Sequence, residues 1–97
     1  MAGSTDPCNQ TAIWKFPVQV ADEQTVMIPG GARILTVAVQ AGTVCLWAEV
    51  CPGHSKRPRT LRIYGTGHPM PGNPGIYIST FMLQDGALVF HAYEAPQ

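Results

Sequence analysis

The residues best suited to chemistry lie in one stretch, positions 59–69, which reads Arg-Thr-Leu-Arg-Ile-Tyr-Gly-Thr-Gly-His-Pro. Its first half alternates like a strand, so Arg62 and Tyr64 are expected on one face. Its second half is a turn with two glycines, in which successive backbone N–H groups can form an anion-binding nest. A guanidinium beside such a nest binds two phosphate oxygens at once through its planar fork of donors. The stretch therefore predicts a site for a small phosphorylated ligand.

An aromatic ring for this site is expected from the preceding strand, positions 43–51. If that strand pairs with 59–64, cross-strand neighbours lie about 4.5–5.5 Å apart, and Trp47 would stand beside Arg62 or Tyr64. The ring would stack on a nucleobase while arginine holds the phosphate. The predicted ligand-binding residues are Trp47, Arg59, Arg62, Tyr64, Gly65, Thr66, Gly67 and His68. The alternative is that Trp47 and Tyr64 belong to the core or to a subunit interface, and that the glycines only permit the turn.

The charges of the chain are few and unevenly placed. Lysine and arginine number 6 and aspartate and glutamate 6, so the formal net charge is zero. Four of the six basic residues lie within seven positions, namely Lys56, Arg57, Arg59 and Arg62, whereas the acidic residues are scattered. A neutral chain lacks the broad basic surface that a nucleic-acid polymer requires, and its net charge gives no reason to expect an anionic membrane as a partner. The local cluster suits a compact anion, with a solvated loop as the alternative.

Cysteine and histidine provide weaker candidates for chemistry. The candidate metal ligands are Cys45, Cys51, His54 and either His68 or His91. Their spacing matches no zinc motif, and a cysteine in mid-strand is more often a small buried apolar residue. Cys51 and His54 would make a nucleophile–base pair, but no third group is evident to orient the histidine. We therefore expect no metal, no cofactor and no enzymatic activity, and we expect His91 to be half-buried and hydrogen bonded.

Seven short segments have the alternation or composition of strands, and none has helical periodicity. The expected strands cover residues 11–20, 25–28, 33–40, 43–51, 59–64, 76–84 and 87–94. Ala41-Gly42 and Asp85-Gly86 are expected to be tight hairpin turns. The pattern predicts an all-β domain, either a small antiparallel β-sandwich or a barrel, with about seven strands in largely meander order.

Length and composition place these strands in one domain. A chain of 97 residues suits a single core, expected at residues 11–97 after a flexible tail at 1–10 whose first residues resemble an expression-vector remnant. The three cysteines are an odd number, which predicts no disulfide framework and a reducing cytosol. The sequence shows no signal peptide and no apolar run long enough for a membrane span. Charged residues are only 12% of the chain, which favours a homo-oligomer that covers apolar surface.

Four short sequences give the chain a distinctive pattern: Ile-Trp-Lys-Phe-Pro at 13–17, Cys-Leu-Trp-Ala at 45–48, Ile-Tyr-Gly-Thr-Gly-His-Pro at 63–69 and Leu-Val-Phe-His at 88–91. In this combination, over residues 12–94, the chain resembles a family of small bacteriophage and prophage proteins with the pattern IWKYP, LCLWA, IYGTGHP and LVFHVFE. It departs from that pattern in its last strand, which reads His-Ala-Tyr-Glu at 91–94. The resemblance carries no established activity to transfer.

The resemblance implies a setting rather than an activity. Small phage-encoded β proteins without enzymatic motifs resemble either virion components or counter-defence proteins, some of which sequester nucleotide signals of bacterial immunity. With the predicted anion site, the leading expectation is a non-enzymatic sponge in the host bacterial cytoplasm. Its ligand would be a cyclic nucleotide or an ADP-ribose-derived signal. The alternatives are a phage structural or protein-interaction module, and a direct protein inhibitor of a host defence enzyme.

Overall fold

A computed structural model describes residues 8–96 of the chain. Within this range the chain forms seven strands, so the all-β prediction is confirmed. The strands are β1 (Ala12–Pro17), β2 (Glu23–Pro29), β3 (Arg33–Gln40), β4 (Thr43–Val50), β5 (Lys56–Gly65), β6 (Ile76–Leu83) and β7 (Leu88–Glu94). This part of the chain contains no helix that could cross a membrane.

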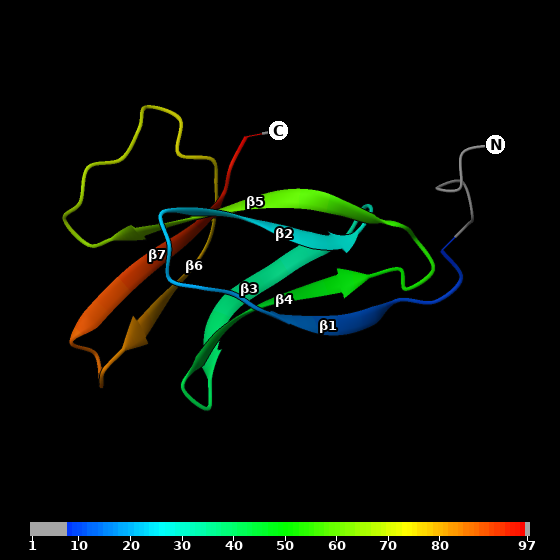
Figure 1. Cartoon of the computed structure of the whole chain (residues 1–97), viewed down its shortest axis with the longest axis horizontal. Coiled ribbons are helices and arrows are strands. Elements are labelled where there is room, and N and C mark those ends of the chain that lie inside the picture. The colour runs from blue at the N-terminus through cyan, green and yellow to red at the C-terminus, as the bar shows by residue number, and fades with distance from the viewer. Residues whose placement is uncertain (1–7, 97) are drawn as a thin grey trace.

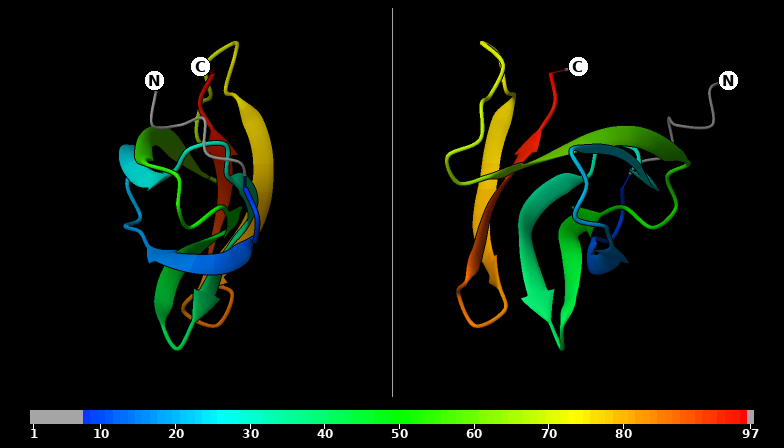
Figure 2. Two further views of the ribbon diagram at one scale, coloured as in Figure 1. Left: turned by 90° about the vertical axis from the view of Figure 1, so that its right-hand side faces the viewer. Right: turned by 60° about the vertical axis from the view of Figure 1, so that its left-hand side comes forward.

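The strands form two antiparallel sheets that make a small β-sandwich (Figures 1 and 2). The first sheet has the order β1-β4-β3 and the second has the order β2-β5-β7-β6. Only β3–β4 and β6–β7 pair consecutive strands, so the expectation of a largely meander order is wrong. The reason is that residues 51–55 carry the chain from the first sheet to the second, and β5 therefore pairs with β2 and β7 instead of β4.

β5 is the strand on which the second sheet is built. Its first part, from Lys56 to Arg62, pairs with β2, and its last part, from Leu61 to Gly65, pairs with β7. Figure 2 shows β5 as a long ribbon that runs across the molecule and reaches both partners. The strand begins three residues before the predicted start at 59, so part of the predicted loop at 52–58 belongs to the sheet. One continuous strand therefore carries the whole basic cluster and Tyr64.

The core lies between the two sheets. Four alternate residues of β4 belong to it, namely Val44, Leu46, Ala48 and Val50, and all four are buried. The second sheet and β3 complete the core with Val26, Ile28, Val37, Leu61, Ile63, Phe81 and Ala92. Removing these side chains from water is the main stabilising term for a domain of this size.

Both predicted hairpin turns are present. Gln40 pairs with Thr43, which leaves a two-residue loop, and φ is +48° at Ala41 and +81° at Gly42. Two successive positive φ values are typical of the type I′ turn, whose twist matches that of the strands it joins. The second turn, between β6 and β7, includes Asp85-Gly86, both with positive φ. Local turn chemistry therefore fixes these two hairpins.

A side chain on β6 links the two sheets along the side where β6 faces β3. Ser79 Oγ accepts a hydrogen bond from the N–H of Val37 on β3 at 2.9 Å and donates one to the carbonyl of the same residue at 2.8 Å. The hydroxyl thus pairs with both backbone groups of an edge-strand residue that would otherwise lack partners.

A bulge in β6 changes which of its side chains face outward. The pairing of β6 with β7 shifts between Tyr77 and Ser79. Ile78 packs against the core, while the Tyr77 hydroxyl lies 2.7 Å from Thr80 Oγ1. Strict alternation along residues 76–84 would place Tyr77 on the face of Ser79 and Phe81, but the extra residue reverses the alternation at this point. Tyr77 therefore joins the outer face of the second sheet.

Candidate functional site

Three tyrosines stand in a row on the outer face of the second sheet. Tyr93 on β7 lies between Tyr64 on β5 and Tyr77 on β6, with ring centroids 5.4 Å apart in both pairs and interplanar angles of 77° and 68°. Tyr77 is 54% exposed and the other two rings are half-buried. Edge-to-face pairs of this kind contribute about 0.5–1.5 kcal/mol each beyond the area they bury. We call this surface the tyrosine face; its other members are Arg62, Thr66, Thr80 and His91.

His91 occupies the centre of the tyrosine face with both ring nitrogens hydrogen bonded. Its Nε2 lies 2.7 Å from Thr66 Oγ1 and its Nδ1 lies 2.9 Å from Thr80 Oγ1. Because Thr66 Oγ1 donates its proton to the Val89 carbonyl, it accepts from Nε2–H, and Nδ1 then accepts from Thr80. The Tyr77 hydroxyl completes the chain by donating to Thr80 Oγ1. The expectation of a half-buried, hydrogen-bonded His91 is confirmed, and the network holds the side chains of this surface in fixed orientations.

Arg62 closes one end of the tyrosine face. Its Nε donates to Glu23 Oε1 at 3.0 Å, and its Nη1 lies 3.5 Å from the Asn73 carbonyl. The hydrogen bond to Glu23 raises the pKa of Arg62, burial opposes this rise, and Tyr64 adds a smaller increase. The Tyr64 hydroxyl donates to the Pro74 carbonyl at 3.5 Å. The loop at 66–75 is therefore tied to the sheet through two predicted site residues, which share one face of β5 as expected.

This loop re-enters the sheet at Gly75, where there is no room for a side chain. A Cβ at this position would lie 2.0 Å from the Glu94 carbonyl oxygen, and φ is +110°. We expect Gly75→Ala to push the loop away from β7 and to lower the free energy of unfolding by about 1–3 kcal/mol in urea titrations. Gly72→Ala is the matched control, since a Cβ there meets nothing within 4 Å. Equal effects of the two substitutions would contradict the close approach at Gly75.

Trp47 does not belong to this site. It lies on β4 in the other sheet, opposite Lys15 on β1 and Thr36 on β3. Lys15 Nζ lies 5.8 Å from the centroid of its ring. The predicted pairing of 43–51 with 59–64 is wrong because the intervening loop crosses between the sheets. The aromatic neighbour of Arg62 is Tyr93, its partner in the register of β5 and β7.

Arg59 lies on the inner face of β5 and is engaged within the protein. Two hydrogen bonds join it to Glu94, from Nε to Oε2 and from Nη2 to Oε1, and Nη1 donates to the Ala32 carbonyl at 2.8 Å. The hydrogen bond to Glu94 raises the pKa of Arg59, and burial partly opposes the rise. The arginine side chain is 21% exposed and the glutamate 12%. These bonds give Arg59 a structural role in place of the predicted ligand contact.

The glycine turn after β5 is present, and two of its backbone N–H groups are hydrogen bonded within the protein. Thr66 N–H donates to the Val89 carbonyl at 3.2 Å, and His68 N–H donates to the Gly65 carbonyl at 3.1 Å. A cavity of 420 Å³ beside the turn is lined by Asp22, Ile63, Tyr64, Gly65, His68 and Pro69. The lining contains a carboxylate and neither lysine nor arginine. The predicted anion cradle at Gly65, Thr66, Gly67 and His68 is therefore not assembled with the cations that it requires.

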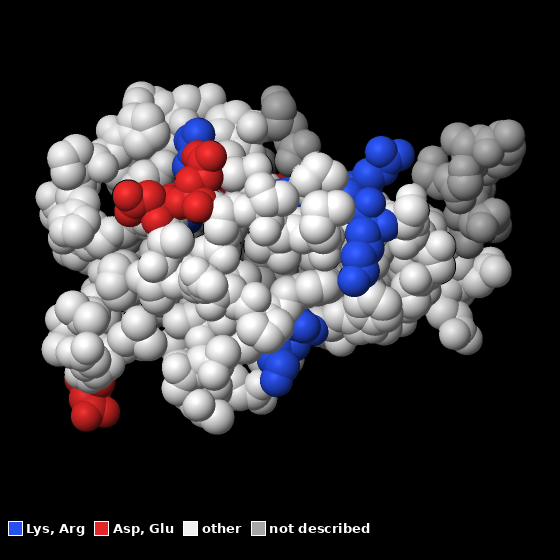
Figure 3. All heavy atoms as spheres, viewed as in Figure 1, with Lys and Arg blue, Asp and Glu red and all other residues white. Residues whose placement is uncertain are grey.

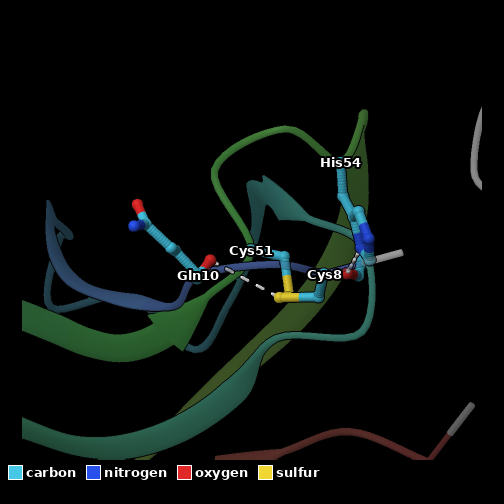
Figure 4. Close-up of a disulfide and its surroundings, with 5 residues drawn as sticks. Cys8, Gln10, Cys51 and His54 are labelled. Carbon is cyan, nitrogen blue, oxygen red and sulfur yellow. Dashed lines mark hydrogen bonds between the residues drawn. A yellow bond between two sulfur atoms is a disulfide. The ribbon is translucent and has the colours of Figure 1, made fainter. Parts of the chain in front are cut away.

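Two of the three cysteines form a disulfide. Cys8 is bonded to Cys51, which follows β4, and their Cα atoms are 5.6 Å apart (Figure 4). Cys45 is free and buried. The expectation of no disulfide is therefore wrong, because an odd count conceals a pair when one partner lies in a segment that looks like a flexible tail. Residues 1–7 of that expected tail lie outside the described residues.

The disulfide also bears on the two alternative roles considered for Cys51, as a metal ligand and as a nucleophile paired with His54. A bonded sulfur is neither a nucleophile nor a metal ligand, so the Cys51–His54 pair cannot act in catalysis while the bond is intact. His54 Nδ1 instead lies 2.9 Å from the Gly30 carbonyl, to which it must donate. Within residues 8–96 no group of three or more potential metal ligands comes together.

Residues 9–97 match a protein family described as "Domain of unknown function (DUF7352)". The chain belongs to this family. The matched region includes both sheets and the whole tyrosine face. Searches of curated proteins and of solved structures give no match.

In this member of the DUF7352 family, sequence reasoning found Arg62, Tyr64 and Thr66 but missed the other half of the tyrosine face. The missed residues are Tyr77, Thr80, His91 and Tyr93. Alternation along 87–94 already places His91 and Tyr93 on one face, so the signal for β7 is in the sequence. That signal places His91 and Tyr93 beside Arg62 and Tyr64 only when β7 is known to pair with β5. This pairing joins residues that lie far apart in the sequence.

Proposed function

We propose that the chain is a non-enzymatic binding module that docks a partner protein through the tyrosine face. The observation that carries this proposal is the row formed by the half-buried Tyr64 and Tyr93 and the exposed Tyr77, with Arg62 at its end. Tyrosine and arginine are among the residue types that dominate binding energy at protein interfaces. Tyrosine offers a large apolar ring and a hydroxyl while losing little rotational freedom, because it has only two side-chain torsions.

The preorganisation of this surface supports the proposal. His91 holds Thr66 and Thr80, and Thr80 in turn holds Tyr77, so these side chains are already ordered. Ordering side chains on binding costs about 0.5–1.5 kcal/mol for each flexible group. A surface whose groups are ordered in the free protein avoids much of this cost.

The shape and charge of the tyrosine face favour a protein over other ligands. Small-ligand sites are concave and bury most of their ligand, whereas this face is the outer surface of a sheet. Nucleic acids require several unpaired cations, whereas Arg62 is paired with Glu23. The phosphorylated-ligand hypothesis gains no support from this face and stays a prediction that needs a different site.

The chemistry of the face also favours a partner of a different kind over a second copy of the chain. Hydroxyls from Tyr77, Thr80 and Thr66 make it polar, and only Met82, 58% exposed, continues it as an apolar side chain along β6. Interfaces between proteins that also exist apart have this mixed character, whereas homodimer interfaces are more apolar. With the resemblance to phage-encoded proteins, we expect the partner to be a host-cell protein.

The test is face-dependent capture from a lysate of the host bacterium, followed by titration of the captured protein. Tyr77→Ala should weaken binding by about tenfold or more, because it removes an exposed ring and one end of the hydroxyl chain. Ile13→Ala, which removes a 63% exposed side chain from β1 in the other sheet, is the matched control and should bind like the wild type.

Two outcomes would overturn the proposal. The first is that both variants retain the same proteins as the wild type. The second is that light scattering shows an oligomer of the chain that Tyr77→Ala disperses, which would assign the tyrosine face to self-association.

A further inference from the structure

The structure divides the basic cluster of β5 into two halves. Arg59 and Arg62 are paired with Glu94 and Glu23. Within residues 8–96, neither Lys56 nor Arg57 has an ion pair or a side-chain hydrogen bond. Figure 3 shows basic atoms over the start of β5 with no acidic atoms beside them, whereas acidic and basic atoms lie together near the start of β2. The unbalanced positive charge therefore lies at the first end of β5.

Arg57 lines a concave site at this end. A cavity of 330 Å³ is bounded by Gly30, Gly31, His54, Ser55 and Arg57, which we call the Arg57 corner. Gly31 and Arg57 also line a neighbouring cavity of 610 Å³, whose wall includes apolar side chains. The apolar members of that wall are Pro58, Ile76, Ala95 and Pro96. The same wall also contains Arg59 and Glu94, which are paired with each other. A guanidinium corner beside a partly apolar cavity can hold a phosphate and the body of a small molecule together.

The turn between β2 and β3 positions the arginine and supplies a donor. A Cβ on Gly30 would lie 3.4 Å from Arg57 Cγ, so the arginine stem crosses the turn where glycine leaves space for it. Gly30 N–H donates to the Ser55 carbonyl at 2.9 Å, which fixes the turn against the loop before β5. Gly31 has φ +75°, and its N–H makes no hydrogen bond with the described residues. His54 donates to the Gly30 carbonyl and braces the opposite wall.

We propose that the Arg57 corner binds the phosphate group of a small molecule. An unpaired guanidinium, a backbone N–H in a glycine turn and the Ser55 hydroxyl are the donors that phosphate oxygens accept. None of the residues of this corner belongs to the tyrosine face, so the site is independent of the proposed protein docking. Its cation, Arg57, belongs to the basic cluster but is not one of the ligand-binding residues predicted from the sequence.

The experiment is a titration with inorganic phosphate at constant ionic strength, followed by amide NMR. The amides of Gly30, Gly31 and Ser55 should shift and saturate. Arg57→Gln should weaken binding by at least about tenfold, because it removes a charge-assisted hydrogen bond. Arg57 makes no ion pair and no side-chain hydrogen bond with the described residues, and glutamine keeps most of its stem, so the variant should keep its unfolding temperature.

Lys56→Gln is the matched control, since it removes the same charge one residue away from a side chain that does not line the corner. It should weaken binding far less than Arg57→Gln, and equal weakening would show diffuse attraction and overturn the proposal. Adenosine monophosphate should shift the same amides, whereas adenosine should leave them unchanged. Shifts caused by adenosine, or no saturable shift with phosphate, would also overturn it.

Discussion

Breaking the disulfide between Cys8 and Cys51 should lower the free energy of unfolding by about 4 kcal/mol. The bond links residues separated by 43 positions, and closing a loop of this length removes entropy from the unfolded chain that corresponds to this amount. The total free energy of unfolding of a small domain is only about 5–15 kcal/mol. The midpoint of thermal unfolding should therefore fall by about 20 °C.

The measurement is thermal and urea unfolding with and without a thiol reductant. The Cys8→Ala, Cys51→Ala double variant should unfold like the reduced wild type, and the reductant should not change it further. Cys45 is buried and free, so it gives the reductant no second target. A wild-type unfolding curve that the reductant leaves unchanged would contradict the prediction.

The disulfide also removes one argument about the compartment in which the protein works. The odd cysteine count favoured a reducing cytosol only on the assumption that the cysteines are unpaired. Structural disulfides persist in oxidising surroundings and are rare in the cytosol. The host cytoplasm therefore stays a prediction that depends on the family resemblance alone, and the reduced form becomes the relevant state if that prediction holds.

The parts of the fold that local chemistry controls could be predicted from the sequence. The Ala41-Gly42 turn requires positive φ at two successive residues, and the sequence supplies a glycine for one of them. The inward face of β4 follows from alternation. Strand order could not be predicted, because residues 51–55 are equally able to close a hairpin or to cross between sheets. The choice between the two depends on which faces are buried against each other.

The same limit explains why the candidate site was only half predicted. Arg62 and Tyr64 share a face because they are two positions apart on one strand, which alternation shows directly. Tyr77 is reversed by a bulge at Ile78 that no periodic pattern reveals. The distinction between Arg57 and Arg59 depends on Glu94, which lies 35 positions from Arg59 along the chain. Sequence proximity therefore grouped cations that the fold assigns to different roles.

Arg59→Met should lower the free energy of unfolding by about 3–5 kcal/mol, because it leaves the Glu94 carboxylate, which is 12% exposed, without its arginine. It also deprives the Ala32 carbonyl of its donor. The folded-state pKa of Arg59 is raised by Glu94, so the stabilisation is fully present below the unfolded-state pKa. It is lost only in strongly alkaline solution, as the pH rises through the folded-state pKa. The part of the difference in the free energy of unfolding between wild type and variant that comes from Arg59 ionisation should therefore be constant near neutral pH.

Two comparisons identify the cause of this loss. Arg62→Met removes the arginine of an ion pair whose glutamate is 59% exposed, so it should lower the free energy of unfolding far less than Arg59→Met does. The Arg59→Met, Glu94→Leu double variant removes both charges and should recover much of the stability lost by Arg59→Met, because it also removes the largely buried carboxylate that Arg59 neutralises. Urea unfolding at one pH gives the five free energies that are needed, those of the wild type, of Arg59→Met, Glu94→Leu and Arg62→Met, and of the double variant. A double variant that is as unstable as the sum of its single changes would show that Arg59 and Glu94 stabilise the fold separately, through packing, and that their ion pair contributes little.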